Sequence, residues 1–150
     1  MNADALELLQ YDHDALRRKL ALLESALRFS PHTWYVLREA CFLLSRRLHE
    51  HMEREAKLAD WFADDPIVAG ALGPMLCAHQ PDFRRLRDVN QQLIQEPEQL
   101  PEALEPSLAA LIESMRRHLD EQERRLFPAA VARQEAAEFA TCEATEVGNV

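Results

Sequence analysis

The chain has 150 residues, 47% of them hydrophobic, which is enough for one domain with a sizeable core and too short to suggest two. A formal net charge of −9 disfavours a nucleic acid partner, because phosphate backbones repel an acidic protein without a basic stretch. No apolar run approaches the roughly 20 residues that cross a bilayer, and the N-terminus lacks a basic segment followed by an apolar one, so we expect a cytoplasmic protein without a membrane partner.

The sequence predicts an all-α fold, because helix-favouring residues dominate and only three glycines are present. Ser30 and Pro31 can cap and start the second of four predicted helices, and Pro97 and Pro101 bracket the connection to the fourth. The helices are expected over about 3–29, 31–62, 75–95 and 102–127.

We expect these helices to pack as an antiparallel up-down four-helix bundle over residues 1–132. Residues 64–74 hold most of the helix-breaking residues and are expected to form the longest loop. Residues 133–150 lack apolar periodicity and are expected to form a flexible C-terminal tail.

Each predicted helix carries apolar residues at steps of three and four, which places them on one face, and each of these stripes includes a histidine. His13 fills the gap between Leu9 and Leu16 in the first helix. The polar side chains expected to face the bundle axis are His13, His51, Glu55, His79 and His118.

A metal centre would explain why several imidazoles and a carboxylate share one core. Burying a polar ring without a partner costs roughly 2 kcal/mol or more, and an unpaired carboxylate costs considerably more. His51 and Glu55 are four residues apart, so they lie about 40° apart around the helix axis and can ligate adjacent metals. Imidazole nitrogens with carboxylate oxygens suit iron, manganese or zinc rather than a thiophilic metal.

These residues resemble the hemerythrin-like, or HHE cation-binding, domains over roughly residues 9–128. The matching pieces are Tyr11-Asp-His13-Asp, His51-x-x-x-Glu55, His79, and His118-Leu-Asp-Glu-Gln-Glu123-Arg-Arg-Leu-Phe-Pro128. The five-residue step from His118 to Glu123 and the Leu-Phe-Pro ending are typical of the family's fourth helix. The resemblance implies two non-haem iron ions, bridged by Glu55 and Glu123, with the histidines as terminal ligands. The implied metal ligands are His13, His51, Glu55, His79, His118 and Glu123.

The resemblance also implies a protein that binds or reacts with dioxygen or nitric oxide. Sensing, the response to oxidative or nitrosative stress, and iron handling are the roles that follow from it. A metal- and gas-binding protein is implied rather than a turnover enzyme, and we assign no catalytic residue. A protein partner or a homodimer remains open.

The third helix departs from the family pattern, which usually has two histidines four residues apart. Met75 and Phe83 stand four residues before and after His79, so the iron near His79 is expected to keep an open or water-filled position. Pro81 lacks an amide donor and predicts a kink or a helix start near it. A register shifted by one residue would put Gln80 at the ligand position.

Several neighbouring side chains are interpreted as structural. His49 and Glu53 repeat the four-residue spacing but are turned about 160° away from His51, and they are expected to form a surface pair. Cys41 and Cys77 fall at apolar positions and are expected to be buried. Gln122 lies on the stripe and is placed to hydrogen-bond a ligand.

The alternative function is a metal-free helical bundle that serves as a protein-interaction module. In that case the buried polar groups pair with one another. A ferritin-like oxidase is disfavoured because it needs Glu-x-x-His pairs on two helices, and no histidine here has a glutamate three residues before it.

Overall fold

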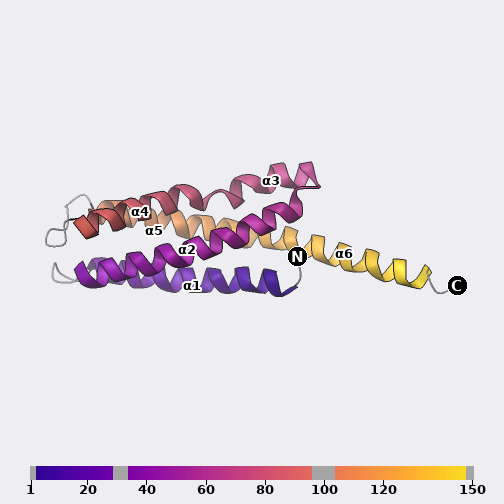
Figure 1. Ribbon diagram of the computed structural model, residues 1–150, viewed down its shortest axis with the longest axis horizontal. Helices are drawn as coiled ribbons and strands as arrows, with labels where there is room; N and C mark the ends of the chain where they lie inside the picture. The colour runs from indigo at the N-terminus through magenta and orange to yellow at the C-terminus, as the bar shows by residue number, and fades with distance from the viewer. Residues whose placement is uncertain (1–2, 29–33, 96–103, 148–150) are drawn as a thin grey trace.

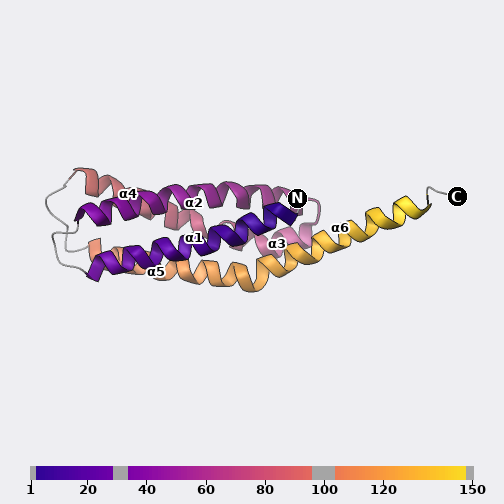
Figure 2. The same ribbon diagram turned by 90° about the horizontal axis from the view of Figure 1, so that it is seen from below.

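The computed structural model describes residues 3–28, 34–95 and 104–147, and helices account for nearly all of them. Four helices lie side by side in Figures 1 and 2: α1 (Ala3–Arg28), α2 (Trp34–Phe62), α4 (His79–Gln95) and α5 (Leu104–Glu121). Each packs on two of the others, in the cyclic order α1, α2, α4 and α5, so they enclose a common core. The described ranges contain no strand, and the predicted all-α helical bundle is confirmed.

The limits of the first two helices follow the sequence pattern closely, since α1 ends at Arg28 and α2 ends at Phe62. The predicted cap at Ser30 and Pro31 and the connection around Pro97 lie outside the described residues. Within the described ranges, no helix is long and apolar enough to cross a membrane.

The core consists of two apolar clusters with a layer of buried polar side chains between them. In α1, Leu9 belongs to one cluster and Leu16 to the other, and His13 lies between them in the sequence. Buried polar residues also separate the two clusters along α2, between Met75 and Leu86, and between Leu119 and Leu126. These residues are His51, Glu55, His79, Asp82 and Gln122. Helical steps of three and four keep these residues on the inner face, so the helices deliver their polar side chains to one level of the bundle.

The predicted loop over residues 64–74 is wrong, because Pro66–Leu76 forms a further helix, α3. Asp65 caps this helix, since its carboxylate accepts hydrogen bonds from two backbone N–H groups of the first turn, each at 3.2 Å. Pro66 occupies the first helical position, where its missing N–H has no intrahelical partner to lose and its fixed φ suits a helix. Residues that usually break helices therefore start one here. Met75, near the C-terminal end of α3, packs in one of the two apolar clusters.

The predicted helix over 75–95 is divided, because α3 ends at Leu76 with Cys77 as its C-cap, and α4 begins at His79. Pro81 lies in the first turn of α4, where backbone N–H groups lack intrahelical acceptors, so the proline is tolerated. The predicted helix start near Pro81 is confirmed. The prediction that Cys77 is buried is wrong, because this break exposes it, whereas Cys41 is buried as predicted.

A π-helical turn over Gln122–Leu126 joins α5 to α6 (Phe127–Val147). Figures 1 and 2 both show α6 leaving the bundle and extending away from it. The predicted boundary between residues 132 and 133 therefore falls inside a helix. α6 has no apolar stripe along its length. The helix propensity of its many alanines is consistent with its helical structure. Its flexibility stays a prediction.

Candidate metal centre

Four histidines form a row across the bundle core, one from each of the four packed helices. Consecutive ring centroids lie 4.9, 5.3 and 5.5 Å apart in the order His13, His51, His79 and His118. The first three rings are almost completely buried, and His118 is 18% exposed. The prediction that one imidazole per helix faces the interior is confirmed.

Glu55 lies in the same layer, one turn of α2 after His51. Its Oε1 is 3.2 Å from His51 Nε2, and its side chain is 2% exposed. Within the described residues, both ring nitrogens of His51 and of His79, and Oε2 of Glu55, are buried without a hydrogen-bond partner. Buried polar groups are nearly always satisfied in folded proteins, so these five atoms are the signature expected of a site for a bound ion.

Asp12 is a buried carboxylate beside His51, the second histidine of the row. Its Oδ2 lies 3.6 Å from His51 Nδ1, and its carboxylate also accepts hydrogen bonds from Arg54. Burial raises the pKa of Asp12, but His51 and Arg54 outweigh burial and hold the pKa below its usual range. Asp12 follows Leu9 by three residues and precedes Leu16 by four, so the apolar spacing could have revealed it.

Asp82 is a second buried carboxylate, at the His118 end of the row. Its Oδ2 lies 2.7 Å from His118 Nδ1 and 3.7 Å from His79 Nδ1, and its Oδ1 accepts a hydrogen bond from Ser114 Oγ at 2.9 Å. Burial raises the pKa of Asp82, but these three partners lower it below its usual range. Asp82 follows His79 by three residues and shares its helix face, which is the sequence signal that could have identified it.

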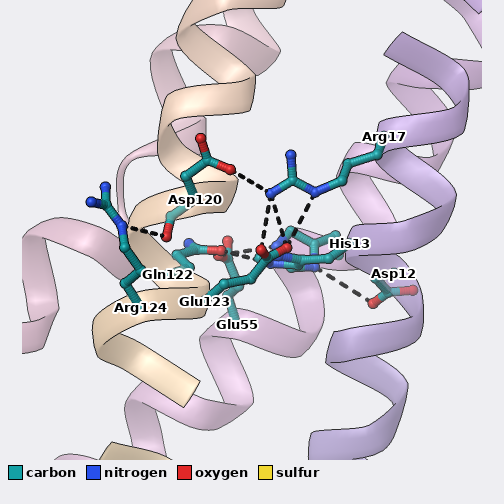
Figure 3. Close-up of polar contacts among 9 residues, drawn as sticks. Asp12, His13, Arg17, Glu55, Asp120, Gln122, Glu123 and Arg124 are labelled. Atoms are coloured by element: carbon teal, nitrogen blue, oxygen red, sulfur yellow. Dashed lines mark hydrogen bonds and ion pairs between the residues drawn. The ribbon is translucent and has the colours of Figure 1, made fainter. Parts of the chain in front are cut away.

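Glu123, one of the two predicted bridging carboxylates, lies at the edge of the layer and is 39% exposed. Its Oε1 is 3.0 Å from His13 Nδ1, and both of its oxygens accept hydrogen bonds from Arg17 Nη2 at 3.0 Å. Figure 3 shows Glu123 between Arg17 and His13, with Asp120 also bound to Arg17. The carboxylate therefore contacts the nitrogen of His13 opposite to the one that faces Gln122.

Gln122 points into the layer and is only 1% exposed. Its Oε1 lies 3.0 Å from His13 Nε2, and its amide nitrogen donates to Glu55 Oε1 and to the backbone carbonyl of Met75 at 2.9 Å. The prediction from the apolar stripe that Gln122 hydrogen-bonds a residue of the layer is confirmed. At the π turn, the interior position belongs to Gln122 and the outer position to Glu123.

The charges of the layer differ from one histidine to the next. Burial and the neighbouring His51 lower the pKa of His13 to about 4, so His13 is neutral near neutral pH. Burial also opposes protonation of His51, but Asp12 and Glu55 outweigh it and raise the pKa of His51 to about 9. A metal ion that binds His51 must therefore displace a proton, which couples metal binding to proton release.

Two trios of possible ligand atoms converge in the layer, with all three atoms of each trio within 4.8 Å of one another. The trios are His51 with Glu55 and His79, and His79 with Asp82 and His118. Their imidazole nitrogens and carboxylate oxygens are donors that fit iron, manganese or zinc. Of the predicted ligands, His13 and Glu123 belong to neither trio.

His49 and Glu53 repeat the four-residue spacing of His51 and Glu55 but face solvent. Both side chains are exposed, and His49 Nε2 lies 3.5 Å from Glu53 Oε1. The predicted surface pair is confirmed, and Glu53 provides a matched control for Glu55.

The fold and the site together define a helical bundle whose core carries a layer of metal-ligand side chains. The chain matches the model of the hemerythrin HHE cation-binding domain over residues 4–130. This match covers most of the chain and every residue of the layer, so the chain belongs to the hemerythrin HHE cation-binding family. No curated protein and no solved structure matches the chain.

Proposed function

We propose that the buried polar layer binds two non-haem iron ions, for which manganese or zinc can substitute. The observation that carries this proposal is the group of unpartnered buried atoms on His51, Glu55 and His79, which form one of the trios and share His79 with the other. The side chains proposed to hold the ions are His13, His51, Glu55, His79 and His118. Glu123 remains a ligand implied by the family resemblance.

Ferrous ions bound there would supply a redox centre that can bind a diatomic gas such as dioxygen or nitric oxide. The surrounding side chains limit the access of water, since an apolar cluster lies on each side of the layer and the ring of Phe127 is 4.6 Å from that of His13. Gln122 brings an amide N–H into the interior. These features favour a metal- and gas-binding protein over a turnover enzyme.

We place this protein in gas sensing, in the response to oxidative or nitrosative stress, or in iron handling, rather than in oxygen transport. Reversible transport needs a second iron with a full set of ligands, and the family's second histidine on this side is replaced by Met75 or Phe83. The antiparallel order of the helices, the cytoplasmic location, and a homodimer or protein partner remain predictions from the sequence.

A metal-free bundle used for protein interaction is the second candidate. It is favoured by the hydrogen bonds that Gln122 makes to Glu55 and Met75, and by the pairing of His51 with Asp12. The two hydrogen bonds satisfy part of the polar layer without a metal, and the carboxylate of Asp12 can balance a charge on His51.

Anaerobic reconstitution with ferrous ion, followed by desalting and metal analysis, tests the proposal. We expect close to two iron ions per chain, because four histidines and a carboxylate are too many ligands for one tetrahedral ion. A protein that stays folded by circular dichroism yet takes up no iron, manganese or zinc would instead support the metal-free bundle.

A further inference from the structure

A groove of about 350 Å³ is lined by residues from the start of α1 and the second half of α2. The lining residues are Ala5, Leu8, Leu9, Arg54, Lys57 and Trp61. The volume lies within the range of small-molecule sites, roughly 300–1,000 Å³, so the groove can accommodate a ligand of modest size.

Apolar side chains form most of the wall of this groove. Leu9 is buried, Leu8 is 47% exposed, and Trp61 is partly buried against one of the two apolar clusters. The indole of Trp61 is also held by its neighbours, because its ring centroid lies 5.4 Å from that of Phe62 and 5.3 Å from the guanidinium carbon of Arg133. A ligand that packs on a side chain already fixed in place avoids the cost of ordering it.

Both charged residues of the lining are cations, in a chain whose formal net charge is −9. Arg54 is fixed, because its Nη1 donates to both oxygens of the buried carboxylate of Asp12. Within the described ranges the hydrogen bonds of Arg54 use Nη1, so Nε and Nη2 can donate to a further acceptor. Lys57 follows Arg54 by three residues, which puts the two side chains on neighbouring parts of one helix face.

The charges at the groove favour an anion with a single negative charge. Arg54 and Lys57 bring two positive charges, and Asp12 balances one of them, which leaves one to be neutralised. A carboxylate supplies that charge, and its two oxygens match the donor fork of a guanidinium. A doubly charged phosphate would bring an excess negative charge into a partly apolar groove.

We propose that the groove binds a medium-chain fatty acid, with its carboxylate at Arg54 and Lys57 and its alkyl chain against Leu8 and Trp61. The two cations recognise the head group, and the apolar wall selects for the chain. The groove shares no side chain with the proposed metal ligands, so binding can be measured whether or not the protein holds metal.

Octanoate is the probe, and the fluorescence of Trp61 reports its binding. The chain has two tryptophans, so the Trp34→Phe variant leaves Trp61 as the only one. We expect octanoate to change this fluorescence saturably, with one molecule bound per chain by isothermal titration calorimetry. Hexanoate should bind more weakly, by about fourfold for each methylene lost, and octanol should bind more weakly because it lacks the charge. No saturable binding of octanoate, or equal affinities for octanoate and octanol, would overturn the proposal.

Lys57→Gln tests the contact with the head group. Lys19→Gln is its matched control, because Lys19 is the chain's other lysine and lies outside the lining. We expect Lys57→Gln to weaken octanoate binding about two- to fivefold, as for an exposed ion pair, and added salt to reduce the difference. Lys19→Gln should bind octanoate like the wild type. Equal affinities in the two variants at low salt would contradict the proposed orientation and overturn the proposal.

Leu8→Glu tests the apolar wall, and Leu22→Glu is its control, since both leucines lie in α1 and are 47% and 45% exposed. A glutamate at position 8 competes for the cations and repels a carboxylate, so we expect no octanoate binding at concentrations that saturate the wild type. Leu22→Glu should bind like the wild type, and circular dichroism checks that both variants are folded. Binding to Leu8→Glu as tight as to Leu22→Glu would show that octanoate does not occupy this groove.

Discussion

Gln122 donates a hydrogen bond from its amide nitrogen to Oε1 of Glu55, which joins the π turn after α5 to α2 inside the bundle. Both side chains are almost completely buried. The bond satisfies one oxygen of Glu55 and leaves Oε2 without a partner in the described part of the chain. Gln122 is thus a neutral side chain at an interior position where a carboxylate would add a second negative charge.

Gln122→Glu is expected to destabilise the metal-free protein and to tighten metal binding. Without metal, the variant loses a donor to Glu55 and places two carboxylates together, which we expect to cost about 1–3 kcal/mol. With metal, the added charge is neutralised and supplies another ligand. Urea unfolding with and without zinc measures both effects. A variant that matches the wild type in both conditions would show that position 122 does not reach the site.

Glu55→Ala is expected to lose the bound metal pair, whereas Glu53→Ala keeps it. Glu55 is buried beside His51, and Glu53 lies two residues away with an exposed side chain. Metal analysis after reconstitution and desalting compares the two variants directly. Equal retention of metal would mean that the inner face of α2 does not supply the ligands.

Met75→His is expected to slow the loss of iron to a chelator and to slow autoxidation in air. Met75 is buried, and its carbonyl accepts a hydrogen bond from Gln122, so a histidine there would begin close to the layer. His79→Ala is the companion variant. Unchanged rates in Met75→His, together with full metal content in His79→Ala, would show that α3 and α4 contribute no ligand.

The native protein is expected to react quickly with a thiol reagent at Cys77 and Cys142 and slowly at Cys41. The first two thiols are exposed, whereas burial raises the pKa of Cys41 to about 12 and keeps it protonated near neutral pH. Timed labelling followed by mass spectrometry distinguishes the sites, and urea should make all three equally reactive. Rapid labelling of Cys41 in the native protein would indicate that the core around α2 opens readily.

Amide hydrogens beyond residue 134 in α6 are expected to exchange faster than those in the middle of α1. Residues 135–144 are all exposed, so tertiary packing does not stabilise the backbone hydrogen bonds of this part of α6. Hydrogen exchange read by mass spectrometry tests the predicted flexibility. Protection equal to that of α1 would mean that this helix packs on something in solution, such as a second copy of the chain.

Apolar periodicity was sufficient to predict the inner faces of the helices, because it depends only on local spacing. His13, His51 and Glu55 continue leucine series and are buried, and the same spacing identified Gln122 as an interior residue. Asp82 follows His79 by three residues, so the same spacing also places it on the inner face of α4.

Other features could not be read from spacing alone. The π turn after α5 changes which of the following residues face inward. A prediction that assumes 3.6 residues per turn throughout does not account for this change. The helix over Pro66–Leu76 was missed because proline and glycine favour loops on average, whereas Asp65 before Pro66 makes a helix start.

The polar layer also determines how the helices align along the bundle. Leucines recur along every inner face, so apolar packing alone would tolerate a slide of one helix by a turn, about 5.4 Å. Such a slide would carry His13 away from Gln122 and Glu123 and place it against leucines, and an unsatisfied buried imidazole costs about 1–3 kcal/mol. The layer therefore selects one alignment among several of similar apolar packing, as a polar core residue does in a coiled coil. This selection needs no metal, so it would preserve these side chains even in a descendant of the chain that had lost its ions.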